Sequence, residues 1–167
     1  MIELQGRVGG AYGGYDITAT SENGSLNGRI GGPVQGKNIQ LDFAAGRVNG
    51  RVGGQYQGFD VRGTMTDTSV DVRLGGEHIG DDLHASVAFG EVTGRFSGKA
   101  LGKDLNLRIS STTLEGRIGG AVDGKDVNLS FSVGMPSIVA VLAAVAVFKA
   151  FEDDHENHGS SGSASSS

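Results

Sequence analysis

The sequence is built on a 22-residue repeat that occurs six times in succession without an insertion. The copies span residues 4–25, 26–47, 48–69, 70–91, 92–113 and 114–135. Each copy has Arg at its fourth position, Gly at its seventh and eleventh positions, and Asp or Asn at its thirteenth. A fixed period of this length is typical of architectures in which one supersecondary unit packs against the next. The repeat therefore indicates one domain, residues 1–150, made of six like units.

Within each copy apolar residues alternate with polar ones, which is the period of a half-buried β-strand. In the last copy Leu114 and Ile118 share one face, and Val127 and Leu129 return to that face after Asp123-Gly124. We expect a two-residue turn at Asp123-Gly124, which would place Ile118 opposite Leu129. Each copy is thus predicted to be a β-hairpin, and six hairpins supply twelve antiparallel strands.

The repeated arginines and acids are predicted to be structural residues on the polar face. The arginines are Arg7, Arg29, Arg51, Arg73, Arg95 and Arg117, and the acids are Asp16, Asp60, Asp82, Asp104 and Asp126, with Asn38 in the second copy. If about four residues join successive hairpins, each Arg lies diagonal to the acid of the preceding copy. The predicted pairs are Asp16 with Arg29, Asp60 with Arg73, Asp82 with Arg95, and Asp104 with Arg117. Arg7 and Asp126 remain, and we expect them to meet where the first and last hairpins close a barrel.

A parallel β-solenoid with one coil per repeat is the alternative fold. Stacked coils would place six arginines in a ladder with a spacing of about 4.8 Å, which like charges disfavour. An antiparallel meander puts a strand between neighbouring arginines. The charge pattern therefore favours the meander.

The segment after the repeats is apolar and is predicted to form a helix over residues 137–150. Pro136 ends the last strand, and residues 138–148 contain no polar side chain. A helix that is apolar all round has to lie inside something. Twelve strands tilted by about 40° close at a radius of roughly 12 Å, which leaves room for a helix about 10 to 12 Å across. We therefore expect a barrel plugged by this helix.

Two other states of the C-terminal segment remain open at this stage. Its valines would also suit a buried strand. It could instead be a membrane anchor, although its uncharged run is shorter than the roughly 20 residues of a spanning helix. Residues 151–167 are acidic and then rich in Gly and Ser, and we expect a disordered tail there.

Charge and cysteine content exclude several classes of function. The chain has no Cys, so thiol catalysis and thiolate metal sites are absent. The net charge is −5, and four acids in residues 152–156 account for most of it, so the body is nearly neutral. Without a basic stripe, nucleic acid is not an expected partner. The first residues lack the pattern of a signal peptide, and we expect a cytoplasmic monomer whose partner is a protein or a lipid head group.

No motif in the sequence predicts an enzyme or a cofactor. Residues 31–38 imitate a phosphate-binding P-loop but lead into a predicted strand, so they are interpreted as a hairpin turn. His78 and His84 have no repeated acid–base partner and are interpreted as surface or packing residues. Asp154, His155 and His158 are weak candidates for a divalent metal, because carboxylates and imidazoles are crowded there.

Twelve antiparallel strands around an apolar C-terminal helix resemble the Tubby-like barrel of Tubby C-terminal domains, LURP-one-related proteins and phospholipid scramblases. The nearest local likeness is the apolar run of residues 138–148. The resemblance implies a non-enzymatic binding or interaction module that works at a lipid or protein surface. The two alternatives are a structural repeat protein that self-assembles and a repeat protein anchored in a membrane by its C-terminal segment.

Overall fold

The computed structural model describes residues 1–10, 13–31, 36–54, 56–76, 78–97, 102–120 and 124–166, with side chains up to His155. This part of the chain forms twelve strands and a C-terminal helix, α1 (Ser137–Ser166). The strands are β1 (Ile2–Gly9), β2 (Gly14–Glu22), β3 (Ser25–Gly31), β4 (Gly36–Ala44), β5 (Arg47–Gly53), β6 (Gly58–Met65), β7 (Ser69–Gly75), β8 (Gly80–Ala88), β9 (Glu91–Phe96), β10 (Lys103–Ile109), β11 (Thr113–Ile118) and β12 (Lys125–Phe131).

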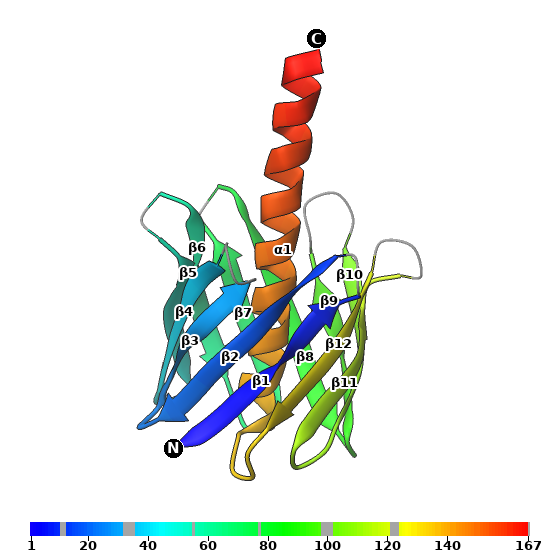
Figure 1. Cartoon of the computed structure of the whole chain (residues 1–167). Coiled ribbons are helices and arrows are strands. Elements are labelled where there is room, and N and C mark those ends of the chain that lie inside the picture. Colours follow the sequence, from blue (N-terminus) through cyan, green and yellow to red (C-terminus); the bar gives the residue numbers. More distant parts are fainter. Residues whose placement is uncertain are drawn as a thin grey trace.

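The strands form one closed barrel, in which each strand pairs with its neighbours in sequence (Figure 1). The barrel closes between β1 and β12, where Leu4 lies opposite Phe131 and Arg7 opposite Asn128. Every pair of neighbouring strands is antiparallel, including the pair that closes the barrel. The predicted meander and its closure are therefore confirmed, and the parallel solenoid is wrong.

The predicted strand register within each hairpin is wrong, because the short turns and the longer loops are interchanged. Ile118 lies opposite Lys125, and Leu129 lies opposite Leu114. Four residues separate the two strands inside each of the first four repeats, as between Gly9 and Gly14, and six separate them in the last two. Two-residue turns instead join successive repeats at three of the five junctions, namely Asn23-Gly24, Ala45-Gly46 and Phe89-Gly90, and their paired positive φ angles are those of type I′ turns. The junctions β6–β7 and β10–β11 are longer. The error is an even number of residues, so each side chain keeps its predicted face.

The same interchange corrects the predicted ion pairs. Each repeated Arg contacts the acid or Asn nine residues later, in its own hairpin, and not the acid of the preceding repeat. The ion pairs are Arg7–Asp16, Arg51–Asp60, Arg73–Asp82, Arg95–Asp104 and Arg117–Asp126, at 2.6 to 3.0 Å, and Arg29 donates to Asn38 at 2.9 Å. Arg7 and Asp126 therefore do not meet, although the barrel closes as predicted.

Four of these arginines also contact the loop at the end of their own hairpin. Arg51 donates through Nε and Nη2 to the carbonyl oxygen of Gly54, at 3.1 and 2.7 Å. Arg7 makes the same two contacts with Gly10, and Arg73 and Arg117 donate through Nε to the carbonyl oxygen three residues later. One guanidinium thus joins two strands and the loop between them.

Helix α1 fills the interior of the barrel (Figure 1). Every residue from Ile138 to Phe148 is at most 2% exposed. The strands contribute their inward residues to the same core, among them Leu26, Leu41 and Leu83. The predicted plug is therefore present, and its apolar surface is covered on all sides by the strands.

The helix extends past residue 150, where the sequence predicts that the plug ends. Phe151 is 9% exposed, and Asp153, Asp154 and His155 make contacts described below. The expected disordered tail therefore does not begin at residue 151. The acidic residues remain helical because the end of the barrel supplies partners for them.

Candidate functional site

Six equivalent residues form a ring inside the end of the barrel where α1 leaves it. They occupy the twelfth position of the repeat and are Tyr15, Lys37, Phe59, Asp81, Lys103 and Lys125. We call them the collar. The neighbouring thirteenth position is Asp or Asn in every repeat, whereas the collar combines aromatic, basic and acidic side chains. The collar side chains differ because most of them contact different residues of α1 at this end of the barrel.

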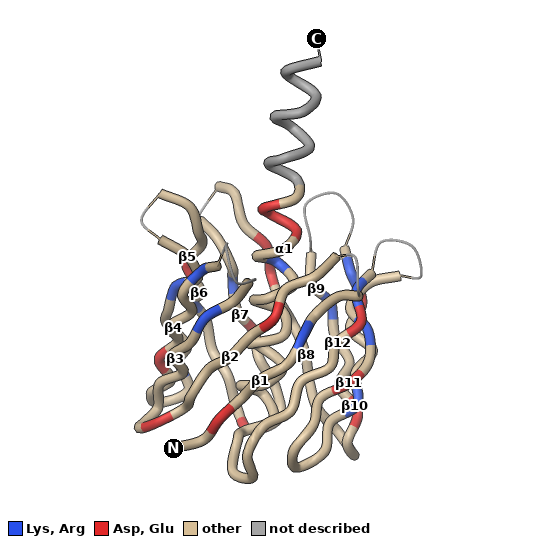
Figure 2. Tube along the Cα trace, viewed as in Figure 1, with Lys and Arg blue, Asp and Glu red and all other residues tan. Residues whose placement is uncertain are grey.

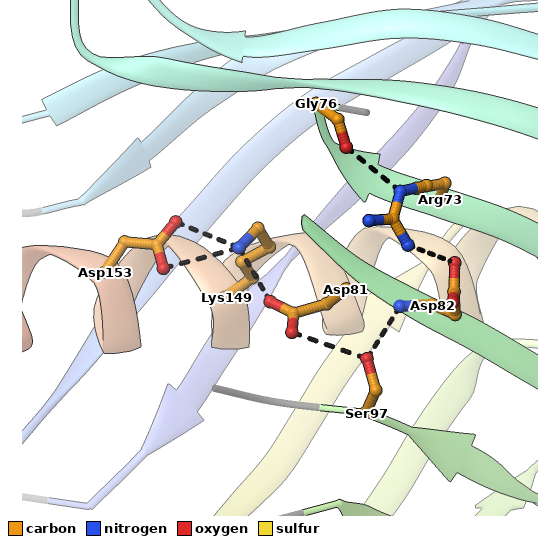
Figure 3. A network of polar contacts seen from close by, with 7 residues as sticks. All are labelled: Arg73, Gly76, Asp81, Asp82, Ser97, Lys149 and Asp153. Atoms are coloured by element: carbon orange, nitrogen blue, oxygen red, sulfur yellow. Dashed lines mark hydrogen bonds and ion pairs between the residues drawn. The ribbon is translucent and has the colours of Figure 1, made fainter. Parts of the chain in front are cut away.

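A buried ion pair joins the collar to the helix (Figure 3). Lys149 Nζ lies 2.8 Å from Asp81 Oδ2 and 3.2 Å from Asp153 Oδ2. Asp81 and Lys149 are only 3% and 4% exposed. The Phe59 ring centroid lies 5.1 Å from the ammonium, within the range of a cation–π contact. Charges buried this deeply require partners of opposite charge. Asp81 and Lys149 are each other's partner.

Ser97 supports this pair and explains a departure from the repeat. The sixth position is Gly in the other five repeats. The Ser97 hydroxyl donates to Asp81 Oδ1 at 3.4 Å and accepts from the Asp82 backbone N–H at 2.8 Å. Ser97, which replaces the Gly of the other repeats, therefore supplies a hydrogen-bond donor to Asp81, the one acid of the collar.

Asp154 is the second point of contact between the helix and the collar. Lys37 Nζ lies 2.7 Å from Asp154 Oδ1, and the Tyr15 hydroxyl donates to Oδ2 at 2.5 Å. Burial raises the pKa of Tyr15 well above its ordinary value. The hydrogen bond to Asp154 and the negative charge of the Asp154 carboxylate raise this pKa further. Tyr15 is therefore held as a neutral donor.

Aromatic side chains complete the contact next to Tyr15. The ring of Phe151 packs edge-on against Tyr15, with centroids 5.2 Å apart, and stacks on His155 at 3.7 Å. Lys125 Nζ lies 5.2 Å from the centroid of Phe151. The collar thus contacts α1 through ion pairs on one part of its circumference and through rings on another.

A pocket of about 420 Å³ opens between the helix and the rim of the barrel. Phe59, Lys149 and Ala150 line it, together with the hairpin ends of β5–β6 and β7–β8. Tyr56 and Ile79, which also line it, are 93% and 79% exposed. The cations at the pocket each have a carboxylate partner: Lys37 with Asp154, Arg51 with Asp60, and Lys149 with Asp81 and Asp153. The pocket therefore combines a charge-balanced interior with an apolar lip.

The weak metal candidates do not form a shared site in the described residues. Asp154 faces Lys37 and Tyr15, and His155 Nδ1 lies 3.0 Å from the carbonyl oxygen of Phe151. The His158 side chain lies outside the described residues. Within that part of the chain, no group of three His, Cys, Asp or Glu residues is arranged to hold a metal ion.

The other sequence candidates occupy the surface. His84 Nδ1 lies 3.2 Å from Asp71 Oδ1, and both side chains are exposed; His78 is also exposed. The segment that imitates a P-loop connects β3 to the antiparallel strand β4, and residues 32–35 within it lie outside the described residues.

Figure 2 shows acidic residues on α1 where it leaves the barrel. Within the described residues, no helix combines the length and the apolar character required to cross a membrane.

Comparison with family models, curated proteins and solved structures gave no match. The resemblance to Tubby-like barrels therefore stays a prediction.

Proposed function

We propose that the chain is a non-enzymatic binding module that engages a protein or lipid surface with the rim around α1. The observation that carries this proposal is the rim pocket with Tyr56 and Ile79 exposed at its lip. Large apolar side chains beside a pocket are typical of interaction sites. The interior of the barrel is occupied by α1, so a partner has to bind at the outside.

The Tubby-like resemblance belongs to this proposal and is one of architecture. A closed wall of twelve strands around a C-terminal helix supports it. Members of that family bind phosphoinositide head groups through basic surface residues, and no residue of this chain is assigned to that role. Cytoplasmic location and a monomeric state are parts of the same proposal.

Two observations count against the alternatives. A closed barrel offers no unpaired strand edge, which a repeat protein that assembles through its sheet would require. The apolar segment that a membrane anchor would use is covered by the strands, since Ile138 to Phe148 are at most 2% exposed. Binding through the rim uses neither of these features.

The test compares two ends of the same barrel. Tyr56→Ser combined with Ile79→Ser removes the apolar lip, and Phe89→Ser removes a fully exposed ring from a turn at the opposite end. Sedimentation with phosphatidylcholine vesicles and with vesicles containing phosphatidylglycerol measures lipid binding. Photo-cross-linking from position 56, with position 89 as the control, measures protein contacts.

We expect sedimentation or cross-linking that depends on the rim and is lost in the double variant but kept in Phe89→Ser. Equal behaviour of the two variants in both measurements would contradict the proposal. Circular dichroism of each variant establishes that the exposed substitutions leave the fold intact.

A further inference from the structure

Two hollows on the outer wall of the barrel lie at equivalent positions of the repeat. The first lies between β5 and β6, has a volume of about 570 Å³, and is lined by Arg47, Val48, Asn49, Arg62, Gly63 and Thr64. The second, about 420 Å³, is lined by the residues 44 positions later, namely Glu91, Val92, Thr93, Asn106, Leu107 and Arg108, and also by Glu115 and Gly116. The same backbone thus presents two different sets of side chains.

The second hollow is lined by one cation and two carboxylates. Arg108 lies directly opposite Glu91 in β9 and opposite Glu115 in β11. Opposite charges facing each other across strands stabilise a sheet modestly. This hollow therefore has a net negative charge, which does not favour an anion.

The first hollow contains cations without an acid. Arg47 lies opposite Thr64, and Asn49 lies opposite Arg62. Arg62 also lies opposite Arg73 of β7, whose guanidinium is already paired with Asp82 at 2.9 Å. In the described part of the chain, neither Arg47 nor Arg62 forms an ion pair or a side-chain hydrogen bond.

The carboxylates on the adjacent strands have other partners. Asp42 lies opposite Asn49 and accepts a hydrogen bond from the Ser25 hydroxyl at 2.6 Å. Asp71 lies opposite Thr64 and is 3.2 Å from His84 Nδ1. Each of these acids flanks the hollow without lining it.

Both arginines depart from the repeat, and they do so at one place. The other residues at the position of Arg47 are Ser25, Ser69, Glu91, Thr113 and Met135. Those at the position of Arg62 are Thr18, Gln40, His84, Asn106 and Asn128. Two basic residues that the repeat does not require have thus been placed on neighbouring strands beside one hollow.

We propose that the hollow between β5 and β6 binds a phosphate or sulfate group. Guanidinium groups match the oxygens of such anions with paired N–H donors. The Asn49 amide and the Thr64 hydroxyl, which line the same hollow, add neutral donors. This site lies on the wall of the barrel and does not depend on the binding surface proposed at the rim.

The test titrates the full chain with sodium phosphate and with sodium sulfate against sodium chloride at matched ionic strength. NMR of the arginine Nε–Hε groups reports each guanidinium separately. We expect saturable shifts at Arg47 and Arg62, and none at Arg108, which two carboxylates flank in the second hollow.

Arg62→Gln introduces the residue found at the equivalent position of the second repeat, and Arg47→Ser introduces the residue of the first and third junctions. Each should weaken phosphate binding about tenfold or more, as expected when a charged hydrogen-bond donor is lost. Arg108→Gln is the matched control and should leave phosphate binding unchanged. Equal shifts at Arg108, or unchanged affinity in Arg62→Gln, would overturn the proposal.

Two further probes distinguish whether the bound phosphate belongs to a small molecule or to a lipid head group. Phenyl phosphate represents a small phosphorylated molecule, and phosphatidylcholine vesicles with and without phosphatidic acid represent a lipid head group. Binding that Arg62→Gln weakens supports the site and assigns its source by the probe that binds. Failure of both probes and of both inorganic ions would overturn the site, whereas the rim variants would still test the proposed function.

Discussion

At the residue scale, the glycine in the third position of the repeat permits neighbouring strands to approach closely. A Cβ on Gly50 would lie 2.1 Å from the backbone oxygen of Gln40 in the adjacent strand. The nearest atoms to such a Cβ all belong to that strand and not to α1. The inward glycines at this position therefore serve the curvature of the wall.

One repeat lacks the glycine at its third position, and a glycine on the neighbouring strand replaces it. The fourth repeat has Val72 at the third position, and its partner across the strands is Gly63. A Cβ on Gly63 would lie 2.2 Å from the backbone oxygen of Asp71. The two strands thus approach closely here as well, with the glycine on β6 in place of β7.

We expect Gly50→Ala to destabilise the fold by about 1 to 3 kcal/mol, because the added methyl group has to displace backbone. Gly54→Ala is the matched control, since a Cβ there would meet no atom within 4 Å. Urea unfolding of the two variants measures the difference. Equal stability of the two variants would show that the close approach at Gly50 is relieved without cost.

Tyr15 makes stability depend on alkaline pH. Its pKa is raised in the fold by burial and by Asp154, so the folded protein keeps a proton that the unfolded chain loses near pH 10. The stabilisation is complete below about pH 10 and is lost as the pH rises towards the pKa of the folded state. Tyr15→Phe should therefore lose less stability above pH 10 than the natural chain, as measured by urea unfolding across pH. An identical alkaline loss in both proteins would contradict this assignment.

At the scale of single elements, the turns between repeats determine the register of the whole sheet. Asn23-Gly24 has φ angles of 53° and 80°, and Phe89-Gly90 has 53° and 77°. Asn is well suited to this left-handed conformation, whereas Phe is not. Phe89 is also fully exposed, so no packing compensates for its backbone strain.

Phe89→Asn is therefore expected to stabilise the protein by about 1 kcal/mol. The reverse exchange at the equivalent turn, Asn23→Phe, should destabilise it by a similar amount. Denaturant midpoints of the two variants measure both effects. A loss of stability in Phe89→Asn would mean that the ring makes a contact that the turn requires.

The contact between α1 and the collar depends on the pair of Lys149 and Asp81. Lys149→Met leaves the Asp81 carboxylate buried without its ammonium and should cost about 3 to 5 kcal/mol. Adding Asp81→Leu removes the uncompensated charge and should recover most of that loss. Urea unfolding of the single and double variants measures this recovery, and a double variant no more stable than Lys149→Met would contradict the role of the pair.

These elements also show what the sequence could predict. The alternation of Leu114, Ile118 and their equivalents predicts the strands and their inward faces, because burial of one face requires a period of two. The predicted register is wrong because Asp123-Gly124 and Asn23-Gly24 carry the same turn signal, and periodicity alone cannot decide between them. The Asn-Gly pair at a point where two φ angles must be positive was the available clue.

At the scale of the whole molecule, barrel and helix complete each other. The inward side chains of the strands would line an open apolar lumen without α1, and α1 is apolar on every side. The sequence predicts this relationship because the length and the apolar character of residues 138–148 match the space that twelve strands leave. The collar was not predictable, because the pairing of Asp81 with Lys149 depends on how the helix is rotated within six like repeats.

The two proposed binding surfaces follow the same logic at this scale. A sixfold repeat provides equivalent positions, and function is expected where one copy differs from the others. The rim differs through Ile79, and the outer wall through Arg47 and Arg62. The constant residues hold the barrel together.

Hydrogen exchange of the intact chain tests most directly whether the helix is part of the core. The backbone amides of Ile138 to Ala150 should exchange only through global unfolding, with an opening free energy equal to that of the most protected strand amides. Exchange of these amides with a smaller opening free energy than the strands would show that the wall persists when the helix opens. That result would contradict a barrel completed by its own C-terminal segment.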